Sequence, residues 1–241
     1  MFIKKKVGII VKNKTLIIII LLTYILVPIL IMNNNYLFEI KFYILTIIGI
    51  LIYILMKLFK ISNKELGLTK NNFILSIKRN LPLIMLFCTI IIILKLFHVD
   101  KYIANETTLF YIFYVFVSCP IQEFLYRGVL GYFEQSSKRK WMWIIISSLC
   151  YSFVHIIYKD ILTCVLTFII GYVWYHLYRK DYNLSGVTLS HIVLGILSIS
   201  LGIVNWIVEN NNFLILIKKK EKQLIVTHQL FFFKYLLSKT L

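Results

Sequence analysis

The chain has 241 residues, of which 60% are hydrophobic and 15% are charged, whereas an ordinary soluble domain is about 45–50% apolar and about 25% charged. Its 27 lysines and arginines outnumber its 10 acids and give a formal net charge of +17. These basic residues cluster between long apolar blocks, as in membrane proteins, and no nucleic-acid motif is present, so a nucleic-acid partner is excluded. We therefore predict a multi-pass protein of the cell membrane, in contact with lipid.

The first apolar stretch, residues 16–32, is predicted to be a spanning helix, with Pro28 as a candidate kink. It is too long for a signal peptide, and no small-residue cleavage site follows it. The lysines before it predict a cytoplasmic N-terminus. A second span is predicted at residues 42–56, and the lysine-rich stretch 57–79 is predicted to be a cytoplasmic loop.

Five more spanning helices are predicted after that loop, at residues 81–97, 109–134, 141–157, 161–178 and 187–204. Residues 223–237 are apolar and aromatic, and they fit either an eighth, short span or an interfacial helix. The predicted fold is therefore an all-α bundle of about seven to eight transmembrane helices, because helices hydrogen-bond their own backbone within lipid. Residues 1–241 are expected to form a single transmembrane domain.

A polar segment interrupts the fourth predicted helix at Gln122, Glu123 and Arg127. Ionisable groups at membrane depth are costly and usually face a protein interior or a cavity. Glu123 and Arg127 are four residues apart with the acid first, which favours an ion pair on one helix face. Glu123 is therefore expected to neutralise Arg127. Two interpretations remain: Glu123 only neutralises Arg127, or it also polarises a water molecule.

Two histidines, His155 and His191, lie in the fifth and seventh predicted helices. If the fourth and fifth helices form a hairpin, Glu123 and His155 lie about 22 and about 26 Å from the turn, and they can face one another. His191 lies only about 9 Å from the start of its helix, so tilt, uneven helix lengths or a deep-set loop must bring it level. We predict that these three side chains converge, the alternative being that each histidine only hydrogen-bonds between helices.

Three motifs in chain order resemble those of the CPBP family, the CAAX-processing and bacteriocin-processing intramembrane endopeptidases, also called Abi proteins. They are Gln122-Glu123-x-x-x-Arg127, Tyr151-x-x-x-His155 and His191-x-x-x-Gly195, within residues 108–204. The family pattern is Glu-Glu-x-x-x-Arg, Phe-x-x-x-His and His-x-x-x-Asn or Asp. This chain departs from it at Gln122, Tyr151 and Gly195.

The resemblance implies an intramembrane endopeptidase that hydrolyses a peptide bond of a membrane-associated peptide or protein, as in bacteriocin or signal-peptide processing or self-immunity. It implies that Glu123 and His155 activate water and that His191 is a metal ligand or an oxyanion donor. A bound Zn²⁺ or other divalent metal would have His155, His191 and Glu123 as its ligands. Gln122 can orient a water but cannot take its proton, and Gly195 offers no side-chain donor.

Two other functions fit the same residues. A catalytically lapsed protein with the CPBP fold could act as an immunity, binding or scaffold protein, which Gln122 and Gly195 favour. A small transporter could use Glu123 and Arg127 as an ion relay, but the chain lacks visible repeats and paired broken helices. The richness in isoleucine, lysine, asparagine and phenylalanine indicates a bacterial source, where prenylated CAAX substrates are generally lacking.

Overall fold

The computed structural model describes residues 2–97 and 106–200, with side chains from residue 14 onward. All the regular structure in these two ranges is helical, which confirms the predicted all-α class. Six stretches are long and apolar enough to cross a membrane, namely Lys14–Met32, Lys41–Leu58, Phe73–Leu96, Thr108–Gln135, Lys140–Tyr158 and Ile161–Asp181. A shorter apolar helix, Leu184–Ser200, follows them. The chain is therefore a multi-pass membrane protein.

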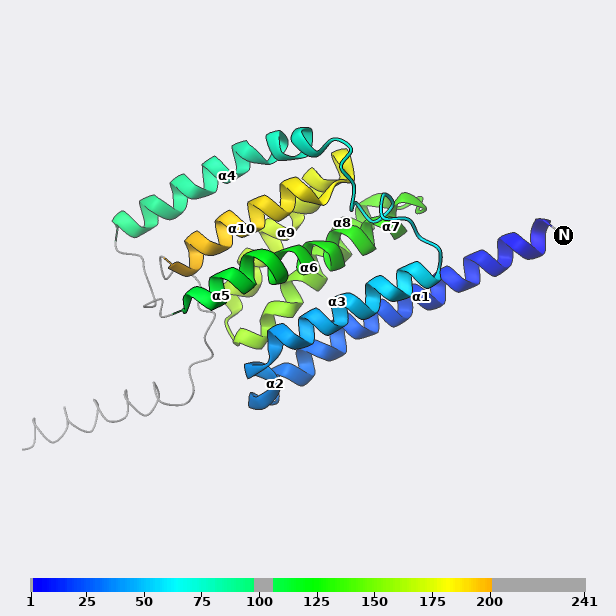
Figure 1. Ribbon diagram of the computed structural model, residues 1–241, viewed down its shortest axis with the longest axis horizontal. Helices are drawn as coiled ribbons and strands as arrows, with labels where there is room; N and C mark the ends of the chain where they lie inside the picture. Colours follow the sequence, from blue (N-terminus) through cyan, green and yellow to red (C-terminus); the bar gives the residue numbers. More distant parts are fainter. Residues whose placement is uncertain (1, 98–105, 201–241) are drawn as a thin grey trace, which may run out of the picture. The chain divides into compact units, whose positions relative to one another are not determined.

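The elements follow one another as shown in Figure 1. They are α1 (Phe2–Met32), α2 (Asn35–Glu39), α3 (Lys41–Leu58), α4 (Phe73–Leu96), α5 (Thr108–Phe113), η1 (Tyr114–Ser118), α6 (Cys119–Glu123), η2 (Phe124–Val129), α7 (Leu130–Gln135), α8 (Lys140–Val154), η3 (His155–Tyr158), α9 (Ile161–Asp181) and α10 (Leu184–Ser200). The elements from α5 to α7 make up the fourth span, and α8 with η3 makes up the fifth. Helix α8 packs against α9, and α4 packs against α10.

The predicted boundary of the third span is wrong. Helix α4 begins at Phe73, so the last part of the predicted loop at residues 57–79 is helical. Arg79 lies inside this helix, and its charge is balanced by an ion pair with Asp181 at 2.5 Å. Asp181, an acid far away in the sequence, therefore allows the helix to include the basic residue Arg79. The local density of lysines did not indicate this extension of the helix. Residues 201–204 and 223–237, which were predicted to be helical, lie outside the described residues.

The connection between α9 and α10 is anchored deep in the protein. The N–H of Leu184 donates to the carbonyl of Gly67 at 3.1 Å. The side-chain amide of Asn183 donates to the carbonyls of Thr69 and Asn71 at 2.9 and 2.6 Å. Gly67 has a φ of +73°, a conformation that glycine adopts without strain. The loop before α4 therefore holds the start of α10, which fixes the depth of every residue along α10.

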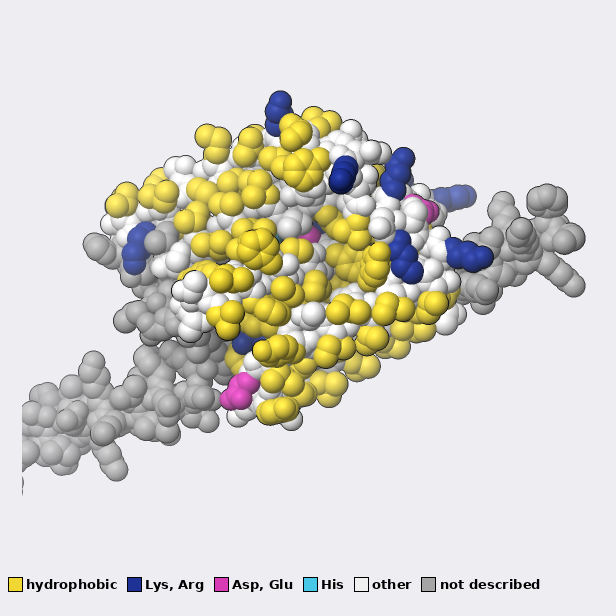
Figure 2. Space-filling view, viewed as in Figure 1, with side chains coloured by type: hydrophobic (Ala, Val, Ile, Leu, Met, Phe, Trp, Pro, Cys, Tyr) yellow, Lys and Arg dark blue, Asp and Glu magenta, His cyan; other side chains and the backbone are white. Residues whose placement is uncertain are grey.

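Apolar side chains cover much of the outside of the helices, as Figure 2 shows. Large hydrophobic residues on α1, α3 and α4 are exposed, among them Ile18, Leu30, Leu51, Ile74 and Met85. Such a surface suits contact with lipid. The polar groups are instead buried inside, including Glu123, Arg127 and His191, which are at most 2% exposed. The bundle therefore surrounds a polar centre.

Candidate active site

The fourth span carries two π-helical turns, one on each side of Glu123. The first is η1 (Tyr114–Ser118) and the second is η2 (Phe124–Val129), with the α-helical turn α6 between them. Pro120 lies at the start of α6 and has no N–H for the usual bond four residues back, which suits a change in hydrogen bonding there. Single π-helical turns within α-helices occur frequently at functional sites.

Glu123 is fully buried, and both of its carboxylate oxygens are engaged. Its Oε2 lies 3.2 Å from Nε of Arg127, which confirms the predicted ion pair. This contact is not aligned as a hydrogen bond. Its Oε1 lies 2.7 Å from Nδ1 of His191. The carboxylate therefore joins the fourth span to α10.

Arg127 is also fully buried, and aromatic rings surround its guanidinium group. Its Cζ lies 4.2 Å from the centre of the Tyr151 ring and 5.4 Å from that of Trp174. Its Nη2 donates to the carbonyl of Gly171 at 3.5 Å. Rings that face a desolvated cation stabilise it. Arg127 is thus held in place and fixes the position of Glu123.

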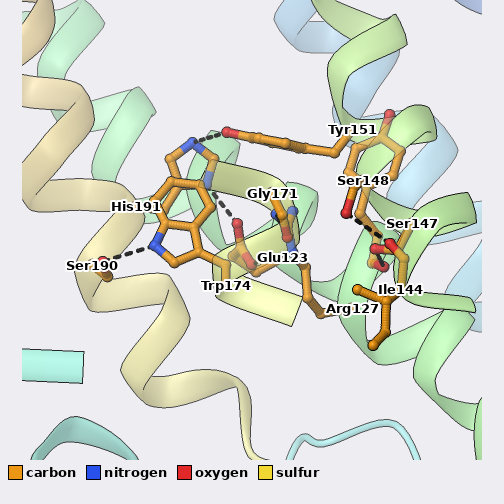
Figure 3. Close-up of polar contacts among 11 residues, drawn as sticks. Glu123, Arg127, Ile144, Ser147, Ser148, Tyr151, Gly171, Trp174, Ser190 and His191 are labelled. Carbon is orange, nitrogen blue, oxygen red and sulfur yellow. Dashed lines mark hydrogen bonds and ion pairs between the residues drawn. The ribbon is translucent and has the colours of Figure 1, made fainter. Parts of the chain in front are cut away.

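His191 is oriented from both ends of its ring, as Figure 3 shows. With Glu123 accepting the hydrogen of Nδ1, a neutral imidazole carries its lone pair on Nε2, which is 3.3 Å from the hydroxyl of Tyr151. The indole of Trp174 stacks on the imidazole at 4.8 Å, and its N–H donates to Oγ of Ser190 at 2.8 Å. The predicted meeting of Glu123 and His191 is confirmed. The start of α10 is held by hydrogen bonds to the loop before α4, and in that position His191 reaches Glu123.

His155 lies on the other side of Tyr151. It begins η3, and its Nδ1 donates to the main-chain carbonyl of Tyr151 at 2.8 Å. The two ring centres are 4.9 Å apart, while that of His191 is 5.6 Å from the same tyrosine. Among the described residues, no hydrogen bond or ion pair joins His155 to Glu123. Two of the three predicted side chains therefore meet directly, and the third is separated from them by a tyrosine ring.

Two cavities lie beside the residues of this site, and Tyr151 lines the first of them. The first, which we name the His191 cavity, has about 190 Å³ and is lined by His191, Trp174, Gly195 and apolar side chains of α4 and α9. The second, which we name the Gln122 cavity, has about 60 Å³ of enclosed space and is lined by Gln122, His155 and apolar side chains of α1 and α3. The two histidines thus face different cavities.

Two of the three departures from the family pattern, Gln122 and Gly195, have clear structural settings. The amide nitrogen of Gln122 donates to Oγ of Ser118 at 2.9 Å, and its oxygen is buried without a partner in the described part of the chain. A Cβ on Gly195 would overlap the hydroxyl of Tyr114. The phenol of Tyr114 therefore occupies the space that a side chain at position 195 would need.

No motif or spacing in the sequence indicated the roles of Trp174 and Tyr114. Trp174 stacks on His191 and faces Arg127, and Tyr114 packs edge-on against His191 with ring centres 6.0 Å apart. Both rings lie in apolar helices of a chain with 16% aromatic residues, so nothing local distinguished them. Tyr151 stands where the family pattern has a phenylalanine, and its hydroxyl and its main-chain carbonyl contact the two histidines.

The predicted metal ligands do not fit a metal in this arrangement. No group of three His, Cys, Asp or Glu side chains in the described ranges is placed to hold an ion. The two oxygens of Glu123 face Arg127 and His191, and the two histidines line different cavities. No step proposed below is therefore routed through a metal.

One comparison with known proteins gives a match. A family model described as "Type II CAAX prenyl endopeptidase Rce1-like" matches residues 104–197. This segment of the chain is similar to that family. The Rce1-like segment contains Glu123, Arg127, His155 and His191, and it confirms the resemblance to the CPBP family. It indicates the fold of a CAAX-type intramembrane protease. No curated protein and no solved structure matches the chain.

Proposed function

We propose that this protein is an intramembrane endopeptidase of the CPBP type that hydrolyses a peptide bond of a membrane-associated peptide or protein. The observation that carries the proposal is the buried 2.7 Å contact between Oε1 of Glu123 and Nδ1 of His191. A carboxylate on Nδ1 fixes the tautomer and leaves Nε2 as the proton acceptor, which is the arrangement of a general base. The base of this site is then His191, with Glu123 as its orienting partner.

The reaction follows from this arrangement. A water in the His191 cavity gives a proton to Nε2 of His191, and its oxygen forms a bond to the carbonyl carbon of the peptide. The hydroxyl of Tyr151, which now lies 3.3 Å from Nε2, is placed to donate to the oxyanion instead. The C–N bond then breaks, and the leaving nitrogen takes the proton from His191. The products are a carboxylic acid and an amine, and the acid then gives its proton to the amine to form a carboxylate and an ammonium group.

Arg127 and His155 have positioning roles in this mechanism. Arg127 holds Glu123 and balances its charge at 0% exposure of both side chains. His155 holds the backbone of Tyr151 through its main-chain carbonyl. The resemblance implies that Glu123 and His155 activate the water. We assign this role to Glu123 and His191 instead, because these two side chains are in contact.

The substrate is proposed to enter from the lipid side. The His191 cavity is lined mainly by apolar side chains from α4, α9 and α10, including Ile91, Leu166 and Leu194. An apolar peptide suits this lining better than a charged one. We propose that the protein lies in the cell membrane of a bacterium, with its N-terminus in the cytoplasm. Its biological role there is the processing of a bacteriocin or a signal peptide, or immunity to one.

The experiment is a peptidase assay of the purified full chain in detergent, with quenched fluorescent apolar peptides. We expect His191→Gln and Glu123→Gln to lower turnover by about 100-fold or more, because general-base catalysis contributes on that order. The exposed His176 supplies the matched control, and His176→Gln should keep wild-type turnover. Undiminished turnover of His191→Gln would refute the proposed base.

A second candidate is a catalytically lapsed protein on the same fold that binds a peptide or a partner. It is favoured by the neutral amide of Gln122, which faces the Gln122 cavity together with His155. An amide cannot accept the proton of a water. Peptidase activity that appears only in Gln122→Glu would support this candidate, whereas an active wild type would reject it.

A further inference from the structure

A groove runs between the first turns of α4 and α10, and we name it the α4–α10 groove. Its walls are residues 67–70 of the loop before α4, Phe73 and Ile77 of α4, and five residues of α10 between positions 184 and 192. It holds about 590 Å³, which is within the range of small-molecule sites. None of these residues lines the His191 cavity or the Gln122 cavity. A molecule in this groove is therefore distinct from the proposed substrate.

A tight contact between the two helices holds the groove in shape. A Cβ on Gly186 would overlap the main-chain carbonyl of Ser76, so the two backbones touch at this point. The N–H of Gly186 donates to Oγ of Ser76 at 3.1 Å, and that hydroxyl donates to the carbonyl of Asn183 at 3.2 Å. Because these hydrogen bonds fix the spacing of α4 and α10, the groove beside them is formed before any ligand binds.

The polarity of the lining changes along the groove. Its polar side chains gather near the starts of the two helices, and they are Thr69, Lys70, Ser185 and Thr188. Ile192 lines the far end, seven residues past Ser185, which is about 10 Å at 1.5 Å per residue. The wall that α4 contributes is apolar throughout. The groove therefore suits an amphipathic molecule with a short polar end and an apolar chain.

The polar end of the groove carries a positive charge and no negative charge. Lys70 is exposed and makes no ion pair with the described residues, and no Asp or Glu lines the groove. The acids nearest in the chain are engaged elsewhere. Glu65 accepts hydrogen bonds from N and Oγ of Ser62, and Asp181 is paired with Arg79. An anionic group thus suits this end of the groove.

The polar end also lies at the expected depth of lipid headgroups. Lys70 comes three residues before the span that begins at Phe73. Figure 2 shows several lysines and arginines on this side of the bundle, which we expect to face the cytoplasm. Cytoplasmic leaflets contain anionic lipids, and basic pockets between spanning helices bind their headgroups. A soluble anion would use the polar end alone, whereas a phospholipid would fill both ends.

We propose that the α4–α10 groove binds an anionic phospholipid. Its phosphate lies at Lys70, its glycerol lies beside Thr188, and one acyl chain follows the apolar wall as far as Ile192. The lipid contacts both the loop before α4 and the start of α10, so it strengthens the anchor that Asn183 provides. The site goes beyond the proposed hydrolysis and does not depend on it.

The probes are dioleoyl-phosphatidylglycerol, which is anionic, and dioleoyl-phosphatidylcholine, which is zwitterionic. Native mass spectrometry of the purified full chain in an uncharged detergent measures the affinity for each. We expect the wild type to bind the anionic lipid about fivefold more tightly, the order that one lysine contributes near an anionic surface. Lys70→Gln should remove this preference, and Lys70→Arg should keep it. Lys138→Gln removes an exposed lysine outside the groove and should leave the preference unchanged.

A second pair of variants tests the apolar wall. Leu189→Trp places a larger side chain in the groove and should weaken the binding of both lipids by about tenfold. Ile74→Trp places the same side chain on an exposed position of α4 outside the lining, and it should bind as the wild type does. His191→Gln should also bind as the wild type does, which separates this site from hydrolysis. Thermal unfolding of each variant establishes that it is folded.

Equal affinities of the two lipids for the wild type would overturn the proposal, and so would an undiminished preference in Lys70→Gln. Undiminished binding by Leu189→Trp would place the lipid outside the groove and would also reject it. Glycerol phosphate tests the soluble alternative. If it raises the unfolding temperature of the wild type as much as phosphatidylglycerol does, the groove is a site for a soluble anion and the lipid proposal fails.

Discussion

At the scale of single residues, the carboxylate of Glu123 decides the organisation of the site. One oxygen faces Arg127 and the other faces His191, and all three side chains are at most 2% exposed. Taking charges out of water is costly, and only close partners offset that cost. The same group that makes the histidine basic at Nε2 is thus needed to bury the arginine. Structure and chemistry are coupled here through one side chain.

This coupling predicts a large stability effect for Arg127→Met. We expect a loss of about 3–5 kcal/mol in the free energy of unfolding, because the partner charge is left buried. Glu123→Gln combined with Arg127→Met should cost less than the sum of the two single changes. Denaturant unfolding in detergent measures both quantities.

Arg79 provides the matched comparison for that prediction. It also pairs with an acid, Asp181, but its side chain is 35% exposed. The side chain of Asp181 is only 3% exposed, so Arg79→Met leaves a buried carboxylate without its partner, but the arginine that is lost was partly solvated. We therefore expect a smaller loss than for Arg127→Met, about 1–3 kcal/mol. Equal losses for the two arginines would contradict the role given to burial.

The contact between Gly195 and Tyr114 gives a second prediction at this scale. Gly195→Ala should destabilise the protein by about 1–3 kcal/mol, because the added methyl group overlaps the phenol of Tyr114 and forces it aside. In a Tyr114→Leu background, the same alanine should cost much less. Thermal unfolding of the four chains of this cycle is the measurement, and an equal cost in both backgrounds would show that the two residues do not interact.

At the scale of elements, the site depends on how one helix end is anchored. Helix α10 begins beside the loop that joins α3 to α4. Asn183, the residue before the helix, is hydrogen-bonded to this loop. The fourth span meets α10 where the π-helical turns η1 and η2 flank Glu123. A shift of α10 by one residue along its axis would move His191 by about 1.5 Å. That shift would break a 2.7 Å contact.

Asn183→Ala should therefore affect both stability and activity. It removes four part-buried hydrogen bonds, two from the side-chain amide to Thr69 and Asn71 and two to Oδ1 from Ser185, at about 0.5–1.5 kcal/mol each, so we expect a loss of about 2–6 kcal/mol. Turnover should fall at temperatures where the variant is still folded, because α10 carries His191. Asn33→Ala is the control, since Asn33 makes one exposed hydrogen bond, to the carbonyl of Ile29. Full turnover of folded Asn183→Ala would show that the anchor does not position the site.

At the scale of the whole described bundle, the connections fall into two groups. The α3–α4 loop meets the end of α7, where Gln135 donates to the carbonyl of Glu65 at 3.2 Å, and it also meets Asn183 before α10. The opposite group contains α2 and the end of η3, where the rings of Phe38 and Tyr158 are 6.0 Å apart. Basic residues gather around the first group, as Figure 2 shows. We expect this side to face the cytoplasm.

Single-cysteine variants test this orientation. In a chain whose four cysteines are replaced by alanine, Tyr36→Cys should react with a membrane-impermeant maleimide on intact cells. Lys138→Cys should react only after the cells are permeabilised, because it lies on the basic side. Mass spectrometry of the labelled protein gives the result. The reverse pattern would invert the topology, and labelling of both positions on intact cells would contradict their separation by the membrane.

The sequence by itself determined the class of the protein, most of its spans, the buried pair of Glu123 and Arg127, and the family to which residues 104–197 are similar. These features follow from patterns that are local in the sequence. They are the length of each apolar stretch, the basic residues between the stretches, and the four-residue spacing of Glu123 and Arg127. Only the tertiary structure decided which histidine meets Glu123. Depth counted along separate helices favoured His155, but the anchoring of α10 by a distant loop brought His191 into contact instead. Contacts between helices depend on where each helix is held, and that information lies in residues far away in the sequence.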